Sequence, residues 1–78
     1  MHYVYILKLE NGLHYTGQTD NVERRMVKHL QSPVPTTKRY KPVGLEFYAA
    51  FKNKKKALEF ERYLKSSSGN AFRNKHLL

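Results

Sequence analysis

The sequence predicts an α+β domain in which helices flank a small three-stranded, mainly antiparallel sheet, in the order ββαβαα. Two runs rich in β-branched and aromatic residues, 2–9 and 13–19, flank Asn11-Gly12, the dipeptide most typical of a β-hairpin turn. A third such run covers residues 45–51, and amphipathic segments follow the second and third runs. With 78 residues, 40% of them hydrophobic, the chain has room for one core, so residues 1–78 are expected to form a single domain.

The first helix is predicted over residues 21–31. Asp20 is its expected N-cap, because Glu23 lies three residues later and completes a capping box. The two prolines within residues 32–35 end this helix. Residues 36–42, which are polar and basic, are predicted to be irregular.

The second helix is predicted over residues 54–67, with Asn53 as its N-cap. Gly69 is the expected C-terminal stop, because glycine readily adopts the left-handed conformation in which many helices end. Residues 70–78 then predict a short last helix.

The charge of the chain points to a polyanionic partner. Lys and Arg number 15 against 6 Asp and Glu, a formal net charge of +9 that exceeds what solubility requires. A basic surface that serves only solubility is the alternative, and nucleic acid is the favoured partner. The cations expected to contact its phosphates are Lys38, Arg39, Lys41, Lys54, Lys55 and Lys56.

Composition excludes several classes of protein. The absence of cysteine excludes a disulfide scaffold, a cysteine nucleophile and a thiolate zinc site, and it fits a reducing cytoplasm. No apolar run approaches the roughly 18 residues of a membrane span, and no signal peptide is apparent. A cytoplasmic location without a membrane partner is therefore expected.

Charged side chains lie where the helices should bury apolar ones. Arg25 and His29 fall within the apolar stripe of the first helix, and Glu61 lies between Ala57 and Leu64 on the second. Burying an unpaired charge is costly. Two explanations stay open. The first is structural, either an internal Arg25–Glu61 salt bridge or side chains that extend into solvent at the edge of the stripe. The second is a site that meets a ligand.

Tyrosines on the predicted hairpin add to the second explanation. Tyr3 and Tyr5 share one face of the first strand, and His14 or Tyr15 returns beside them. Together with an arginine, a histidine and a carboxylate, such phenols supply the groups needed to cleave a phosphodiester. The carboxylate would hold a divalent metal ion, the guanidinium would neutralise the phosphate, and a phenol or imidazole would relay the proton of water.

At these positions the sequence resembles the GIY-YIG nuclease family. It is most similar to the small stand-alone bacterial members, which are related to the N-terminal domain of the repair nuclease UvrC and to homing endonucleases. The two motifs that name the family appear as Tyr3-Val4-Tyr5 and Tyr15-Thr16-Gly17, with nine residues between Tyr5 and Tyr15. The family's catalytic arginine falls on Arg25.

The resemblance continues along the chain. The histidine often found one helical turn after the arginine falls on His29, and residues 57–65 match the family's metal-binding helix. This match places the metal ligand at Glu61. Residues 68–73 also look like this group, so the resemblance covers nearly the whole chain and implies the GIY-YIG endonuclease fold.

The resemblance implies a metal-dependent DNA endonuclease that hydrolyses phosphodiester bonds, in repair, recombination or the processing of mobile elements. Glu61 would ligate one Mg²⁺ or Mn²⁺, and Arg25 would stabilise charge on the phosphate in the transition state. Tyr5 would accept the proton of the attacking water, with Tyr15 orienting that water and His29 assisting.

The sequence departs from the family pattern at several positions. Tyr3 replaces the glycine of the first motif, Thr16 replaces the isoleucine of the second, and Gln18 stands where the repair branch has lysine. Asn70 and Asn74 are both candidates for the family's late asparagine. These departures bear on rate and specificity more than on fold.

Two other functions stay open. The first is a basic nucleic-acid-binding module that is catalytically weak or inactive, and Glu61 argues against it because a pure binder needs lysines and no carboxylate on that helix face. The second is an interaction protein whose basic face meets an acidic partner protein. Failure to bind either DNA or RNA at low salt would favour this last function.

Overall fold

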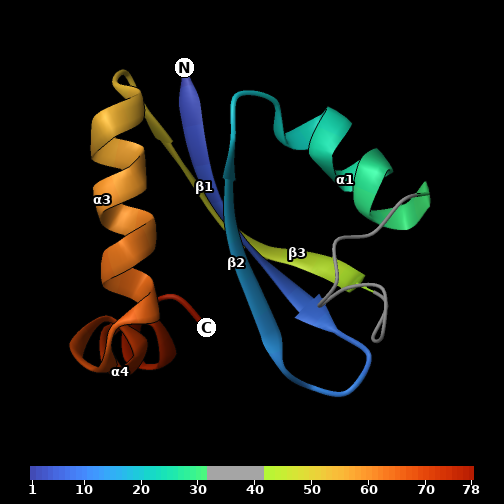
Figure 1. Ribbon diagram of the computed structural model, residues 1–78. Coiled ribbons are helices and arrows are strands. Elements are labelled where there is room, and N and C mark those ends of the chain that lie inside the picture. The colour runs from blue at the N-terminus through green and yellow to red at the C-terminus, as the bar shows by residue number, and fades with distance from the viewer. Residues whose placement is uncertain (32–41) are drawn as a thin grey trace.

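The computed structural model describes residues 1–31 and 42–78, with only the backbone of residues 27–31 (Figure 1). Its secondary structure follows the predicted order of two strands, a helix, a strand and two helices. The elements are β1 (His2–Leu9), β2 (His14–Thr19), α1 (Val22–Gln31), β3 (Pro42–Phe51), α3 (Lys54–Lys65) and α4 (Ser67–His76). The α+β class is therefore confirmed.

The three strands form one antiparallel sheet in the order β2-β1-β3, so β1 lies at its centre. The turn between β1 and β2 contains Gly12 with a φ of 85°, a conformation that glycine adopts without strain. Hydrogen bonds from Leu9 N to Leu13 O (2.8 Å) and from Gly12 N to Leu9 O (3.0 Å) close the turn. The predicted Asn11-Gly12 hairpin is confirmed.

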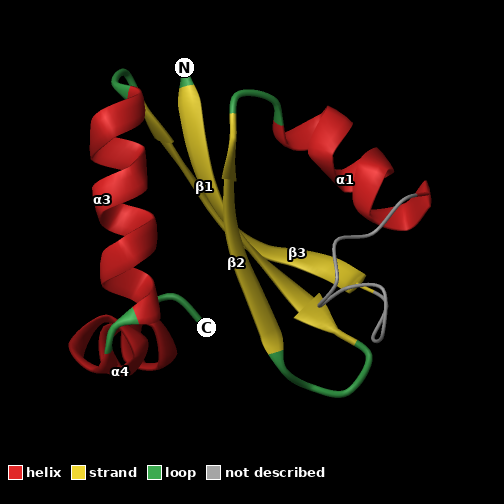
Figure 2. Ribbon diagram, viewed as in Figure 1, coloured by secondary structure: helices red, strands yellow, loops and turns green. Residues whose placement is uncertain are grey.

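Helices cover the sheet on both sides. Helices α3 and α4 lie against one side and α1 lies on the other (Figures 1 and 2). The hydrophobic core joins Val4 and Ile6 of β1 to Ala57 and Leu64 of α3. Half-buried side chains complete this core, namely Phe47, Phe51, Phe60, Phe72 and Leu77.

The central strand separates two environments because its side chains alternate between the faces. Val4 and Ile6 face α3 and the core. The intervening Tyr3 and Tyr5 therefore face the side on which α1 lies, and Tyr3 contacts the ring of Tyr48 on β3 (6.3 Å between centroids). In the described part of the chain, no helix has the length and apolar character that crossing a membrane requires.

The start of α1 differs from the prediction by one residue. Asn21, not Asp20, caps the helix, because its Oδ1 accepts a hydrogen bond from the backbone N of Arg24 (2.9 Å). Asp20 instead pairs with the guanidinium of Arg24 at 2.9 Å. At the next helix, the predicted cap is confirmed, since the Asn53 side chain accepts from the backbone N of Lys55 and Lys56.

The junction between α3 and α4 also differs. Ser66, not Gly69, separates the helices, since its backbone N donates to Tyr63 O (3.0 Å) and its Oγ accepts from Gly69 N (3.1 Å). Gly69 lies inside the first turn of α4, where a Cβ would be 1.6 Å from Tyr63 O. This glycine permits close backbone packing and does not end a helix. Strand β3 likewise begins at Pro42, within a segment predicted to be irregular, because its pairing with β1 extends to Leu9.

Candidate active site

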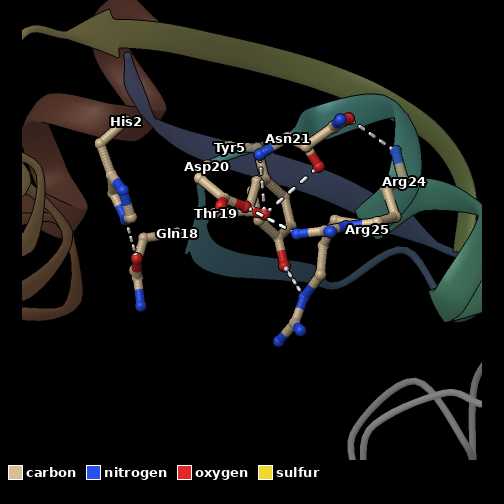
Figure 3. Close-up of polar contacts among 8 residues, drawn as sticks. All are labelled: His2, Tyr5, Gln18, Thr19, Asp20, Asn21, Arg24 and Arg25. Carbon is tan, nitrogen blue, oxygen red and sulfur yellow. Dashed lines mark hydrogen bonds and ion pairs between the residues drawn. The ribbon is translucent and has the colours of Figure 1, made fainter.

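A tyrosine of the central strand meets an arginine of the first helix. Tyr5 is only 1% exposed, and its Oη accepts a hydrogen bond from Nε of Arg25 at 3.2 Å. Figure 3 shows the two side chains pointing toward each other across the space between β1 and α1. Arg25 lies in the first turn of α1, so the Asn21 cap that starts the helix also positions the guanidinium.

Gly17 makes room for the phenol of Tyr5. The two residues are direct partners in the pairing of β1 with β2. A Cβ at position 17 would lie 2.5 Å from Tyr5 Oη and 2.7 Å from Tyr5 Cζ, which is too close for any side chain to fit without movement. The glycine of the second motif is therefore explained by packing against the tyrosine of the first.

Tyr15, on β2, lies beside Tyr5 in the same site. Its ring lies 6.3 Å from the ring of Tyr5 between centroids, at an interplanar angle of 47°. Tyr15 is half-buried, whereas Tyr5 is buried. Three of the predicted site residues, Tyr5, Tyr15 and Arg25, thus come together from three elements.

The surroundings of Tyr5 and Arg25 keep the Tyr5 phenol neutral and the Arg25 guanidinium charged. Burial raises the pKa of Tyr5 above its usual 10.0, which the hydrogen bond from Arg25 offsets only in part, and the charges of Tyr15 and Glu61 raise it further. The pKa of Arg25 is also raised, chiefly by its hydrogen bond to Tyr5. A buried phenol with a raised pKa is a poor acceptor for a proton at neutral pH.

Glu61 enters from α3, on the opposite side of the sheet from α1. Its side chain is 16% exposed, and its Oε2 forms an ion pair with Nζ of Lys65 at 3.1 Å, one turn later. Among the described residues this pair takes the place of the Arg25–Glu61 salt bridge that the sequence left open. The carboxylate is near enough to act on Tyr5 electrostatically, since its charge contributes to the raised pKa of that phenol.

The carboxylate of Glu61 fits a single divalent cation, such as Mg²⁺ or Mn²⁺, that takes few ligands from the protein. A carboxylate offers the oxygen atoms that Mg²⁺ and Mn²⁺ prefer, and Mg²⁺ commonly keeps several waters beside one or two carboxylates. Among the side chains that the structure describes, those of residues 1–26 and 42–78, there is no group of three or more His, Cys, Asp or Glu that could hold a metal ion. A cation here would therefore take most of its ligands from water and substrate.

A cleft of about 370 Å³ adjoins these residues at the β2 edge of the sheet. It is lined by His14, Tyr15, Thr16, Leu64, Lys65, Asn70 and Arg73. His14 and Thr16 point to one face of β2 and Tyr15 to the other, so the cleft wraps around the edge of the strand. The cleft is therefore lined by Tyr15 on one face of the sheet and by Lys65, which pairs with Glu61, on the other face.

The other predicted residues divide into three groups. Lys54, Lys55 and Lys56 are exposed in the first turn of α3. His29 lies on α1, but its side chain is not described, and Lys38, Arg39 and Lys41 lie outside the described residues. Of the two candidate asparagines, Asn70 lines the cleft, whereas Oδ1 of Asn74 accepts hydrogen bonds from Arg73.

Sequence reasoning missed the cations of the cleft, Lys65 and Arg73. Lys65 follows Glu61 by four residues, a spacing that places both side chains on one helix face and could have identified the pair. Arg73 had no such signal, because its place in the cleft depends on the tight turn at Gly69.

Comparison with known proteins identifies the family. Residues 1–75 match the GIY-YIG catalytic domain. The chain is 37% identical over 68 residues to a UPF0213 protein of Staphylococcus saprophyticus, covering 86% of this chain and 83% of that protein. It is 38% identical over 71 residues to a UPF0213 protein of Clostridium perfringens, covering 90% and 76% respectively.

A third relative is matched over a larger share of its own length. A UPF0213 protein of Halobacterium salinarum is 33% identical over 69 residues, covering 87% of this chain and 90% of that protein. No solved structure gives a significant match. On the domain match and these relatives, the chain belongs to the GIY-YIG family, whose nucleases act on nucleic acids and generally use a divalent metal ion.

Proposed function

We propose that this protein is a metal-dependent DNA endonuclease that hydrolyses phosphodiester bonds, in repair, recombination or the processing of mobile elements. The observation that carries the proposal is the contact between Arg25 and Tyr5 beside the ring of Tyr15, in a chain of a nuclease family. This contact holds a positive charge that interacts with Tyr15, and Tyr15 lines the cleft at the sheet edge. Such a charge is suited to stabilising a phosphate as it gains charge in the transition state.

The two tyrosines have different roles in this proposal. Tyr5 is buried and neutral, so it positions Arg25 through the 3.2 Å hydrogen bond and does not accept the proton of water. Tyr15 lines the cleft and is the phenol proposed to accept the proton of the attacking water. The sequence instead predicted that Tyr5 accepts this proton and that Tyr15 orients the water, and the burial of Tyr5 is the reason for the change. His29, one turn after Arg25, assists the proton transfer.

Glu61 is the proposed ligand for one Mg²⁺ or Mn²⁺. When bound, such an ion supplies positive charge to the phosphate and lowers the pKa of a bound water. Glu61 is suited to this because its carboxylate is mostly buried and already holds a cation, the ammonium of Lys65. The six cations Lys38, Arg39, Lys41, Lys54, Lys55 and Lys56 are proposed to bind DNA phosphates.

The test is cleavage of plasmid, branched and single-stranded DNA in Mg²⁺ or Mn²⁺ by matched variants. Glu61→Gln and Arg25→Ala should each lower the cleavage rate by roughly a hundredfold or more. Glu59→Gln is the control, because this exposed carboxylate lies on the same helix and pairs only loosely with Lys56, at 3.7 Å. Folded Glu61→Gln protein that cuts as fast as the parent would overturn the metal-ligand role.

A second candidate function is a basic nucleic-acid-binding module with weak or no catalysis. The observation that favours it is the ion pair of Glu61 with Lys65, which neutralises the carboxylate without any metal ion. The same assay separates the two functions. A parent protein that binds DNA but never cuts it on any of these substrates is a binding module.

A further inference from the structure

The cleft at the β2 edge contains a charge pattern that none of the roles above uses. Two of its described lining residues, Lys65 and Arg73, are basic, and none of its described lining residues is acidic. Thr16, Asn70 and His14 add polar side chains that can hydrogen-bond to an anion. Such a lining is suited to a phosphate group or another small oxyanion.

The cation from α4 is oriented, and none of the ion pairs formed by the described residues includes it. Nε and Nη2 of Arg73 both donate to Oδ1 of Asn74, at 3.2 and 3.1 Å. Asn74 is neutral, so these bonds fix the plane of the guanidinium without cancelling its charge. An oriented guanidinium with donors left over is well suited to a phosphate oxygen.

The cation from α3 links the cleft to the proposed metal ligand. Lys65 lines the cleft and also pairs with Glu61 at 3.1 Å, while its side chain remains 56% exposed. Its flexible four-carbon stem lets the ammonium turn into the cleft when another cation takes the carboxylate. Tyr15 forms part of the same lining.

We propose that this cleft binds the phosphate next to the one that is cut, on the same nucleic-acid strand, through Lys65 and Arg73. The inference rests on the proposed function, since it takes the scissile phosphate to lie between Arg25 and Glu61. A cleft of about 370 Å³ is at the small end of ligand pockets, which suits one phosphate with its sugar. The subsite fixes the position of the strand relative to Tyr15 and Glu61.

The experiment measures binding of a fluorescein-labelled single-stranded oligothymidylate in Ca²⁺ by fluorescence anisotropy, over a range of salt. Lys65→Gln and Arg73→Gln each remove one cleft cation. Their controls are Arg62→Gln on α3 and Lys75→Gln on α4, exposed cations of the same helices that do not line the cleft. Thermal melts establish that all four variants fold.

Each cleft variant should weaken binding more than its control does. It should also make the slope of log affinity against log salt less negative by about 0.7, the contribution of one phosphate contact on a single strand. Equal affinities and slopes for the cleft variants and their controls would overturn the subsite. That failure is distinct from failure of the proposed function, which shows as cleavage that Glu61→Gln does not reduce. Loss of binding in the cleft variants with no cleavage by the parent would show a phosphate site in the cleft, but it would overturn both the nuclease and the position of that site next to a scissile phosphate.

Discussion

Gly17 is the residue on which the geometry of the site depends most directly. A methyl group at this position would lie 2.5 Å from the hydroxyl of Tyr5, whose ring is buried and has little space to move. Gly17→Ala should therefore destabilise the fold by about 1–3 kcal/mol, the usual cost of overpacking. Urea unfolding measures this change.

Two further variants show whether the Tyr5 ring is the cause. Gly44→Ala on β3 is the control, because no atom of the described residues beyond its two chain neighbours lies within 4 Å of its added Cβ, and it should leave stability nearly unchanged. Combining Gly17→Ala with Tyr5→Phe should recover part of the loss, since the nearest clashing atom is removed. If the stability losses of Gly17→Ala and Tyr5→Phe simply add in the double variant, the added methyl group does not clash with the Tyr5 hydroxyl.

The phenol of Tyr5 should make stability fall at alkaline pH. Its pKa is raised by folding, so the unfolded chain loses this proton near pH 10.0 while the folded chain still holds it. The stabilisation is therefore complete below pH 10.0 and is lost as the pH rises toward the folded pKa. Urea unfolding of the parent and of Tyr5→Phe, from neutral pH to about pH 11, should show the parent losing its advantage. A pH-independent difference between the two proteins would contradict this.

At the scale of elements, α3 aligns one of its N-terminal lysines with the proposed site. Seven residues make about two helical turns, so Lys54 shares a face with Glu61 and, one turn further, with Lys65. Lys56 points elsewhere and pairs with Glu59 at 3.7 Å. Of these exposed lysines, Lys54 is therefore in the best position to contact a strand that passes Glu61.

Single substitutions test this alignment. Lys54→Gln should weaken binding to duplex DNA. It should also make the slope of log affinity against log salt less negative by about one unit, the contribution of one phosphate contact. Lys56→Gln changes the charge equally but should change binding less. Anisotropy titrations in Ca²⁺ measure both variants, and equal effects would mean that the lysines act only through net charge.

The elements that sequence predicted well are those set by local chemistry. Asn11-Gly12 predicted the hairpin because its backbone conformation is intrinsic to the dipeptide, and Asn53 predicted the start of α3 because its side chain satisfies nearby backbone groups. Gly69 was misinterpreted because its role depends on a contact with Tyr63 that only the packed helix pair creates. Asp20 was wrongly predicted as the cap because Glu23 completes a capping box with it, whereas Asn21, an equally good cap, accepts the hydrogen bond from Arg24 N.

The site was predictable to a similar degree. Arg25 and Glu61 were identified because polar residues interrupt apolar stripes, a signal that needs no tertiary structure. Their partners were not predicted, because the choice of Tyr5 for Arg25 and Lys65 for Glu61 depends on which side of the sheet each helix covers. The same arrangement determines that Tyr5 is buried while Tyr15 lines the cleft.

At the scale of the whole molecule, the net charge of +9 should dominate binding. Phosphate contacts release counterions, so log affinity for DNA should fall linearly with log salt, with a slope of about −5 if roughly six phosphates are neutralised. Binding should also vary little among DNA sequences, because phosphate contacts do not read bases. Anisotropy titrations on unrelated duplexes measure both properties, and a strong preference for one short sequence would contradict the prediction.

The position of β2 at the edge of the sheet has a consequence for self-association. An edge strand offers unpaired backbone groups to any other strand, and this edge also borders Tyr15 and the cleft. A second copy that paired along β2 would cover the proposed catalytic surface, so dimerisation through this edge should inhibit the proposed cleavage. Its sequence, His-Tyr-Thr-Gly-Gln-Thr, contains no aliphatic side chain to bury in such a pairing and so favours an accessible edge.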